Sequence, residues 1–326
     1  MKKRLLSLGT GQEHLCDLFN HHFDIVPSAN IRYRNTTSVT DINFDALLLI
    51  DSQETTDIEF FCKLNNIPVI GTKRFTKSVQ HLILRKHGIQ TPETFFVYNH
   101  NNKISDFSLV NLLSYVDDKQ QLIIKMDAGA RGLGQLFITK KTFVNYALNG
   151  FSFKERDSEF DAKNSNSFSY ESSNDYYIPE GIGVKVNAPS YIMPQLSRGY
   201  YIIQKYVNVA KEYRYLYFNG ERPIIIERVK GDDDWQANSC VTGNGNYISS
   251  PETEITNFKK IKSKIEELCK ELNTPFLSID LYIDTDGNWG IFEFQMEFGI
   301  LYVPHDLLLK RITNSITNKL SLVTTK

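Results

Sequence analysis

The residues best suited to chemistry lie toward the end of the sequence, on two apolar segments joined by the turn signal Asp284-Thr-Asp-Gly287. Such a composition is typical of a β-hairpin. If the loop centres on the last two of these residues, Asp280 pairs directly opposite Glu293. Gln295 then lies on the same face, because side chains alternate along a strand. The pattern therefore predicts a face that carries two carboxylates and one amide oxygen.

A bare pair of facing carboxylates destabilises a sheet, because the two charges repel each other. A divalent cation removes that objection, and carboxylate and amide oxygens are hard ligands that suit Mg²⁺. An ordinary solvated polar face is the alternative interpretation. The side chains of opposite parity, which are Ile279, Leu281, Phe292 and Phe294, are expected to point into a core.

The run Gly129-Ala-Arg-Gly-Leu-Gly134, between two apolar segments, is a second candidate. A Walker loop ends in Lys-Ser/Thr and opens a helix, whereas this run lacks that ending and leads into a strand. Glycines let successive backbone N–H groups converge on phosphate oxygens, and Lys125 and Arg131 would offset phosphate charge. The pattern is typical of a phosphate-binding flap, with a plain glycine-rich hairpin as the alternative.

The first 90 residues alternate strand and helix patterns, which predicts a small parallel sheet with flanking helices. Strands are expected at Arg4–Leu8, Ala46–Ile50 and Ile67–Ile70, and helices at Gln12–His21, Thr56–Asn65 and Thr76–His87. Pro92 marks a junction to a region of different character.

The rest of the chain divides into two further regions, 91–203 and 204–326. The first is expected to hold strands at Phe95–Tyr98, Leu122–Lys125 and Leu136–Thr139, and a Ser-, Asn- and Tyr-rich lid or insert at 151–200. A strand at Tyr200–Val207 is expected across the boundary between the two regions. The second region is expected to hold strands at Tyr213–Phe218 and Pro223–Arg228, an amphipathic helix over 255–272, the hairpin and a last helix near 305–320.

Composition and charge limit the classes of partner that the protein is expected to bind. The 326 residues carry 37 basic and 38 acidic side chains and a net charge of −1, which gives no footprint for duplex nucleic acid or a membrane surface. The four cysteines lack C-x-x-C spacing, which favours reduced thiols in the cytoplasm over zinc or disulfides. No apolar run is long enough for a membrane helix or a signal peptide, so a soluble, uncleaved protein is expected.

The order of these segments resembles the ATP-grasp superfamily over nearly the whole chain, and within it glutathione synthetase and the ribosomal-protein glutamate ligases. The resemblance implies an α/β and α+β fold with an N-terminal α/β domain. It implies an ATP- and Mg²⁺-dependent ligase that joins a small-molecule or peptide carboxylate to an amine through an acyl phosphate. A homodimer is possible in such a family.

The resemblance also implies roles for particular residues. Nucleotide contacts are expected at Lys77, Lys125, Gly129, Arg131, Gly132, Gly134, Gln204, Lys205, Tyr206, Val207, Glu212, Lys230 and Asn238. Catalytic roles are expected for Arg228, Lys125 and Arg214, and metal ligation by Asp280, Glu293 and Gln295.

Two positions depart from the family pattern. Gln295 stands where the third metal ligand is usually Asn, and Thr76 precedes Lys77 where Asp is common. Two alternatives therefore stay open. One is a kinase-like phosphotransferase on the same scaffold, and the other is a nucleotide-binding regulatory protein without turnover.

Overall fold

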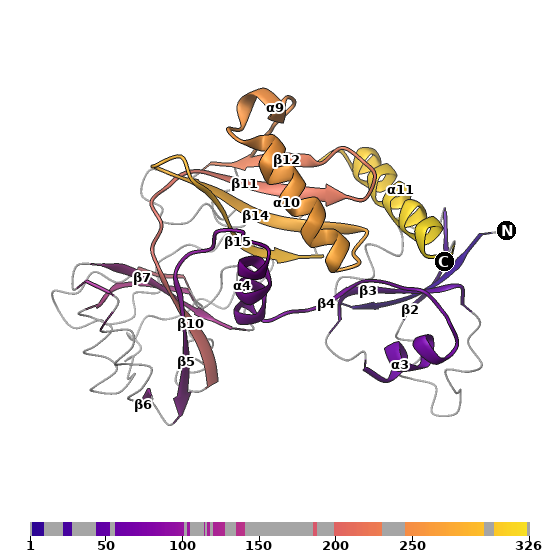
Figure 1. Ribbon diagram of the computed structural model, residues 1–326, viewed down its shortest axis with the longest axis horizontal. Coiled ribbons are helices and arrows are strands. Elements are labelled where there is room, and N and C mark those ends of the chain that lie inside the picture. Colours follow the sequence, from indigo (N-terminus) through magenta and orange to yellow (C-terminus); the bar gives the residue numbers. More distant parts are fainter. Residues whose placement is uncertain are drawn as a thin grey trace, which may run out of the picture.

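The computed structural model describes residues 2–9, 22–27, 44–52, 56–100, 103–104, 114, 116–117, 120–127, 135–140, 185–187, 199–229, 245–296 and 303–324. These residues form sheets of four, six and five strands (Figure 1). None of the described helices combines the length and the apolar character that crossing a bilayer requires.

The N-terminal sheet is parallel throughout, as the alternating strand and helix patterns predict. Its order is β2-β1-β3-β4, with β1 (Arg4–Gly9), β2 (Asp24–Pro27), β3 (Ala46–Ser52) and β4 (Val69–Lys73). Helix α3 (Thr56–Leu64) connects β3 to β4, and α4 (Lys77–Lys86) follows β4. Residues 46–50 are fully buried because both faces of a parallel sheet are covered. The helix expected at 12–21 lies outside the described residues.

The second sheet is antiparallel, with the order β6-β5-β10-β7-β8-β9. Its strands are β5 (Thr94–His100), β6 (Lys103–Ile104), β7 (Gln121–Met126), β8 (Gln135–Thr139), β9 (Lys185–Asn187) and β10 (Gly199–Lys205). The segment 151–200, predicted as a lid or insert, thus contributes the short strand β9 and the start of β10.

The third sheet is also antiparallel, with the order β13-β12-β11-β14-β15. Its strands are β11 (Val209–Phe218), β12 (Ile224–Arg228), β13 (Gly245–Tyr247), β14 (Phe276–Asp284) and β15 (Trp289–Gln295). The accompanying helices are α9 (Pro251–Glu254), α10 (Phe258–Glu271) and α11 (His305–Thr324).

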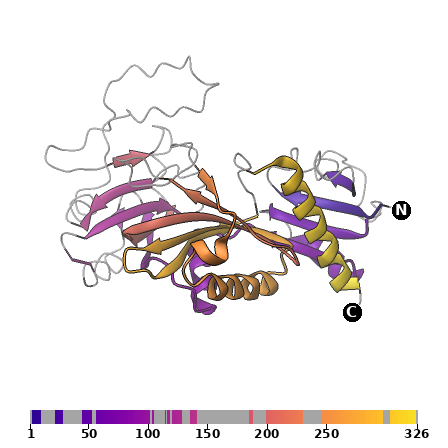
Figure 2. The same ribbon diagram turned by 90° about the horizontal axis from the view of Figure 1, so that it is seen from above.

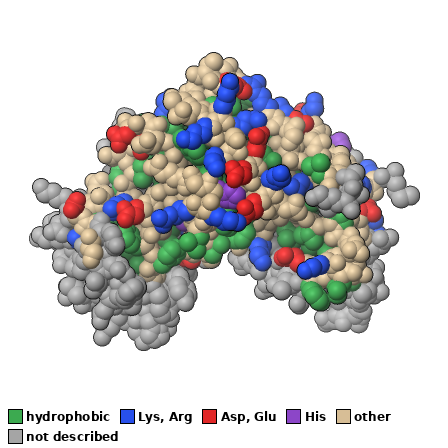
Figure 3. Space-filling model, viewed as in Figure 1, with side chains coloured by type: hydrophobic (Ala, Val, Ile, Leu, Met, Phe, Trp, Pro, Cys, Tyr) green, Lys and Arg blue, Asp and Glu red, His purple; other side chains and the backbone are tan. Residues whose placement is uncertain are grey.

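Helix α10 covers one face of this third sheet (Figure 2). Phe258, Ile261, Ile265 and Leu268 are buried at helical spacing, as the sequence periodicity predicts. Tyr215 of β11 contacts Phe258, with ring centroids 6.4 Å apart, which identifies the covered face. Charged side chains gather on the opposite, outer side of the helix (Figure 3).

The outer edge of β15 is held by the N-terminal region and α4. The Phe294 N–H donates to Gln80 Oε1 at 3.0 Å, and the Ile291 N–H donates to the Gln90 carbonyl at 2.9 Å. The Met296 N–H donates to Asp51 Oδ2 at 2.8 Å. These contacts satisfy an edge that would otherwise expose unpaired backbone groups. They also fix the strand that carries Glu293.

Candidate active site

The hairpin of β14 and β15 places Asp280 directly opposite Glu293, as predicted. The route to that register differs from the prediction. The Asp284 N–H donates to the Asn288 carbonyl at 2.9 Å, so the turn alone would set Phe292 opposite Asp280. A β-bulge at Phe292 shifts the pairing by one residue and restores the opposition.

The bulge overturns the expectation that Phe292 points into the core. Ile279, Leu281 and Phe294 are buried as predicted. The Phe292 ring instead lies 5.5 Å from Lys125 Nζ and 4.4 Å from the Tyr282 ring centroid. An extra residue breaks strict alternation, so Phe292 and Glu293 share one face. Phe292 therefore adds an aromatic surface beside Lys125.

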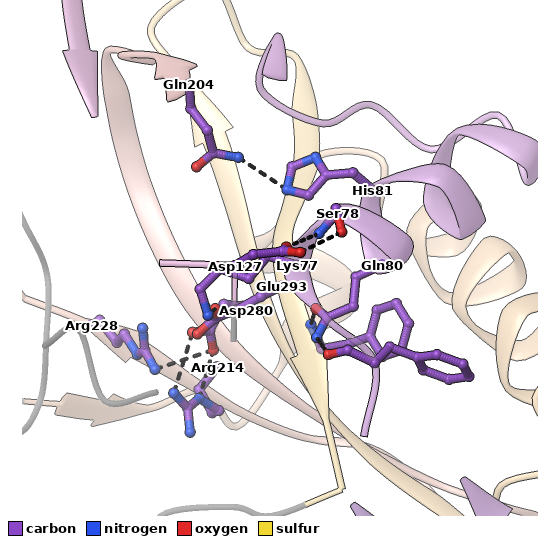
Figure 4. Close-up of polar contacts among 12 residues, drawn as sticks. Lys77, Ser78, Gln80, His81, Asp127, Gln204, Arg214, Arg228, Asp280 and Glu293 are labelled. Atoms are coloured by element: carbon purple, nitrogen blue, oxygen red, sulfur yellow. Dashed lines mark hydrogen bonds and ion pairs between the residues drawn. The ribbon is translucent and has the colours of Figure 1, made fainter. Parts of the chain in front are cut away.

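Asp280 is held by Arg214 of the adjacent strand β11 and by Arg228 of β12, one strand further along the sheet (Figure 4). Arg214 binds it through both oxygens, at 2.7 Å from Nε to Oδ1 and 3.3 Å from Nη2 to Oδ2. Arg228 Nη2 lies 3.1 Å from Oδ1, and its Nη1 donates to Glu212 Oε1 at 2.6 Å. The strand register explains the cluster, because Arg214 pairs opposite Asp280 and Glu212 opposite Arg228.

Glu293 is held by Lys77, with 3.0 Å between Nζ and Oε2. Lys77 is the first residue of α4, and Asp127 caps that helix. The Lys77 N–H donates to the Asp127 carbonyl, while the Ser78 N–H and hydroxyl each donate to the Asp127 carboxylate at 2.8 Å. A carboxylate at a helix N-terminus satisfies free N–H groups and the helix dipole. Asp127 follows β7, so this cap also brings Lys125 near Lys77.

Sequence reasoning missed Asp127. Its place two residues after Lys125, at the end of a strand, is the only sequence signal that it offers. Thr76 stands where the resemblance leads one to expect an Asp before the lysine, and its side chain makes no cap hydrogen bond. Asp127 supplies the missing carboxylate from a segment 49 residues away.

The two carboxyl groups differ in acidity. Burial raises the pKa of Asp280 to about 6; Arg228 opposes this and Glu293 adds to it. The raised pKa has the direction that repulsion between facing carboxylates would give, although burial acts more strongly than the repulsion. Burial also raises the pKa of Glu293, but Lys77 and Lys125 outweigh it and lower the value to about 2. Burial lowers the pKa of Lys125.

The charged side chains that surround Asp280 and Glu293 carry one positive charge in excess. The cations are Lys77, Lys125, Arg214 and Arg228, and the carboxylates are Glu212, Asp280 and Glu293. Such a site suits an anion that binds together with a metal ion. Phosphate oxygens can pair with the lysines and arginines, and the metal ion can bind the carboxylates.

The remaining predicted residues fall into two groups. Gln204 and Lys205 end β10, and Tyr206 and Val207 lead into β11. Lys205 Nζ pairs with Glu93 at 2.5 Å, whereas burial and Glu212 raise the pKa of Tyr206. Gly129, Arg131, Gly132, Gly134, Lys230 and Asn238 lie outside the described residues.

The residues present fit a magnesium ion by the chemistry of their donor set. Asp280 and Glu293 offer hard carboxylate oxygens from facing positions, and Gln295 follows on the same face, opposite Ser278. Within the described ranges, no group of three or more His, Cys, Asp or Glu side chains could hold a metal ion.

No family model and no curated protein matches the chain. Solved structures do match. A D-alanine–D-alanine ligase from Bacillus anthracis is 15% identical with a TM-score of 0.58, covering 100% of this chain and 99% of that one. D-alanyl-alanine synthetase A from Vibrio cholerae is 13% identical with a TM-score of 0.59, over 100% and 99%. A peptide-associated (RiPP) ATP-grasp ligase from Chryseobacterium gregarium, solved with ADP and a leader and core peptide, is 11% identical with a TM-score of 0.53, over 98% and 97%. At these identities the likeness shows the fold, and the fold predicted from the sequence is confirmed.

Proposed function

We propose that this chain, which has the ATP-grasp fold, is an ATP- and Mg²⁺-dependent ligase that joins a carboxylate to an amine through an acyl phosphate. The observation that carries the proposal is the facing pair Asp280 and Glu293, with Asp280 bound to arginines of the same sheet and Glu293 bound to Lys77 of α4. A buried charge network loses hydration on folding, and such networks gather at functional sites. Phosphates and a divalent cation are the ligands that complement it.

The nucleotide would lie between the second and third sheets. Lys125 on β7 and the segment Gln204–Val207 border this space on one side, and Glu212, Asp280 and Glu293 border it on the other. In this arrangement Gln204–Val207 meets the base, Glu212 meets the ribose, and Lys77 and Lys125 meet the phosphates. The proposed division of the chain is 1–90, 91–203 and 204–326.

Each charged group would have a defined task in the transfer. Magnesium, when bound, supplies Lewis-acid neutralisation of phosphate oxygens. Asp280, Glu293 and Gln295 would hold it. Lys125 would orient the phosphates, and Arg228 would hold the transferred phosphoryl group or the oxyanion formed when the amine attacks.

The substrate class follows from the similar proteins only in outline. Ligases that form D-alanyl peptides and a ligase that binds a leader and core peptide share the fold. We therefore propose a small-molecule or peptide carboxylate and an amine as the two substrates besides ATP.

The test is to measure ADP and free phosphate together while pooled amino acids, short peptides and dicarboxylates are offered with Mg-ATP. A ligase releases both products and forms a new amide. Asp280→Asn should abolish turnover, while Asp286→Asn, on the exposed turn of the same hairpin, should match the parent protein. ADP without free phosphate would indicate a phosphotransferase. ATP binding without ADP over the whole panel would indicate a regulatory protein.

A further inference from the structure

A buried polar triad joins three elements next to the proposed nucleotide site. Gln204 on β10 and His81 on α4 are 2% and 3% exposed. Gln204 Nε2 lies 3.0 Å from His81 Nε2 and 3.0 Å from Thr94 Oγ1 (Figure 4 shows the first contact). His81 Nδ1 lies 3.3 Å from the same hydroxyl of Thr94 on β5.

The directions of the hydrogen bonds within this triad follow from one backbone carbonyl, and His81 has a further hydrogen bond with the backbone of Phe292. Thr94 Oγ1 lies 2.8 Å from the Pro92 carbonyl, which can only accept, so the hydroxyl spends its single hydrogen there. The hydroxyl must then accept from its other neighbours. Gln204 therefore turns its NH₂ group toward Thr94, and His81 carries its hydrogen on Nδ1. His81 Nε2 is left as an acceptor for the second hydrogen of the Gln204 amide.

This assignment needs a neutral imidazole. Burial, with a further contribution from Lys125, lowers the pKa of His81 from 6.5 to about 4. The ring is thus neutral near pH 7. Both N–H groups of Gln204 are consumed, and only its Oε1 atom can serve a ligand.

The Gln204 amide lies on the face of the second sheet that carries Lys125. Lys125 pairs opposite Ile202, and Ile123 pairs opposite Gln204. Residues two apart on a strand, and residues opposite each other, share a face. Gln204 and Lys125 therefore face the same space.

We propose that His81 and Thr94 are positioning residues that lock the Gln204 amide with its oxygen available to the base, and that this lock selects 6-amino purines over 6-oxo purines. The inference rests on the proposed nucleotide site. An exocyclic amine can donate to Oε1, whereas a 6-oxo group would set two acceptors against each other. A glutamine that was free to rotate would offer its NH₂ group to the 6-oxo oxygen and lose this selectivity.

The test compares binding of ATP and inosine triphosphate, which differ at the 6 position, by calorimetry with Mg²⁺. The parent protein should prefer ATP by about 10- to 100-fold, the range for leaving one buried acceptor unpaired. Thr94→Val removes the acceptor that orients Gln204 and His81. The affinities for ATP and inosine triphosphate should then lie within about threefold of each other, mainly because inosine triphosphate binds more tightly. Thr94→Ser keeps the hydroxyl and should keep the parent ratio.

Each other outcome is decisive. A purely structural role would weaken both nucleotides equally in Thr94→Val, and an unchanged ratio would overturn the inference. Equal affinity in the parent protein would overturn it while leaving the ligase proposal intact. Absence of binding by either nucleotide would overturn both. Should Thr94→Val fail to fold, nitrogen NMR of the parent protein decides, because the triad requires hydrogen on His81 Nδ1, and hydrogen on Nε2 would refute it.

Discussion

Two groups of ion pairs in this molecule use the same chemistry in different surroundings. On the site face of the third sheet, Arg228 and Glu212 are 2.6 Å apart, with side chains 8% and 11% exposed. On the outer side of α10, Lys262 and Glu266 are also 2.6 Å apart, but their side chains are 41% and 48% exposed. Distance alone therefore does not separate the two groups.

The two groups differ in how much hydration their charged side chains lose on folding. Charges on α10 remain hydrated, so that pair contributes little to stability. Charges on the sheet face lose most of their water, and their mutual attraction must offset that loss. A hydrophobic face would fold as well or better. The retained charges therefore indicate a site whose ligands need them, and the two groups should respond differently to the same type of substitution.

The largest effect is expected for Arg228→Met. The substitution leaves Glu212 and Asp280 buried without this partner, so the free energy of unfolding should fall by about 3–5 kcal/mol. Urea unfolding measures it. Arg222→Met is the matched control, because Arg222 pairs with Glu252 at 3.0 Å with both side chains about half exposed. Similar losses in the two variants would contradict the comparison.

A second effect should appear as a pH dependence. The folded protein holds His81 with a pKa of about 4 against an ordinary value of 6.5. Because the folded-state pKa is the lower one, protonation of His81 favours the unfolded chain. The stability that comes from keeping His81 neutral is therefore complete above about pH 6.5 and is lost as the pH falls toward 4. The loss should approach about 3 kcal/mol. Unfolding of the parent protein and of His81→Gln at pH 7, 6 and 5 should give diverging curves; parallel curves would refute the assignment.

A third, smaller effect concerns Lys77→Met. Glu293 loses its closest cation, and since its side chain is 28% exposed, the unfolding free energy should fall by only about 1–2 kcal/mol. The freed carboxylate should also bind a divalent cation more readily without nucleotide. Paramagnetic resonance of Mn²⁺ titrated into both proteins measures this. Weaker Mn²⁺ binding in the variant would show that Lys77 does not compete with the metal.

The parts of the site that the sequence predicts are those governed by local pattern. Alternation along one hairpin brings Asp280 and Glu293 within one residue of each other, and the bulge at Phe292 makes the pairing direct. Phe292 escapes that reasoning, because alternation does not predict a bulge that sets its ring against Lys125 and against Tyr282 of the same hairpin. The Asp127 cap of α4 and the contact between His81 and Gln204, which are 123 positions apart, leave no periodic trace in the sequence. Only folding brings such residues together.

The smallest effect is expected for Lys262→Met on α10. Lysine four residues before glutamate is the weaker orientation of a helical pair, and Lys262 lies near the helix N-terminus, where the dipole opposes a cation. The unfolding free energy should change by about 0.3 kcal/mol or less. Since salt screens exposed charges, that change should disappear at high ionic strength, while the loss in Arg228→Met should persist because its partners are buried. Urea unfolding of both variants at low and high salt tests this. A salt-resistant loss in Lys262→Met would show that burial does not distinguish the two groups of ion pairs.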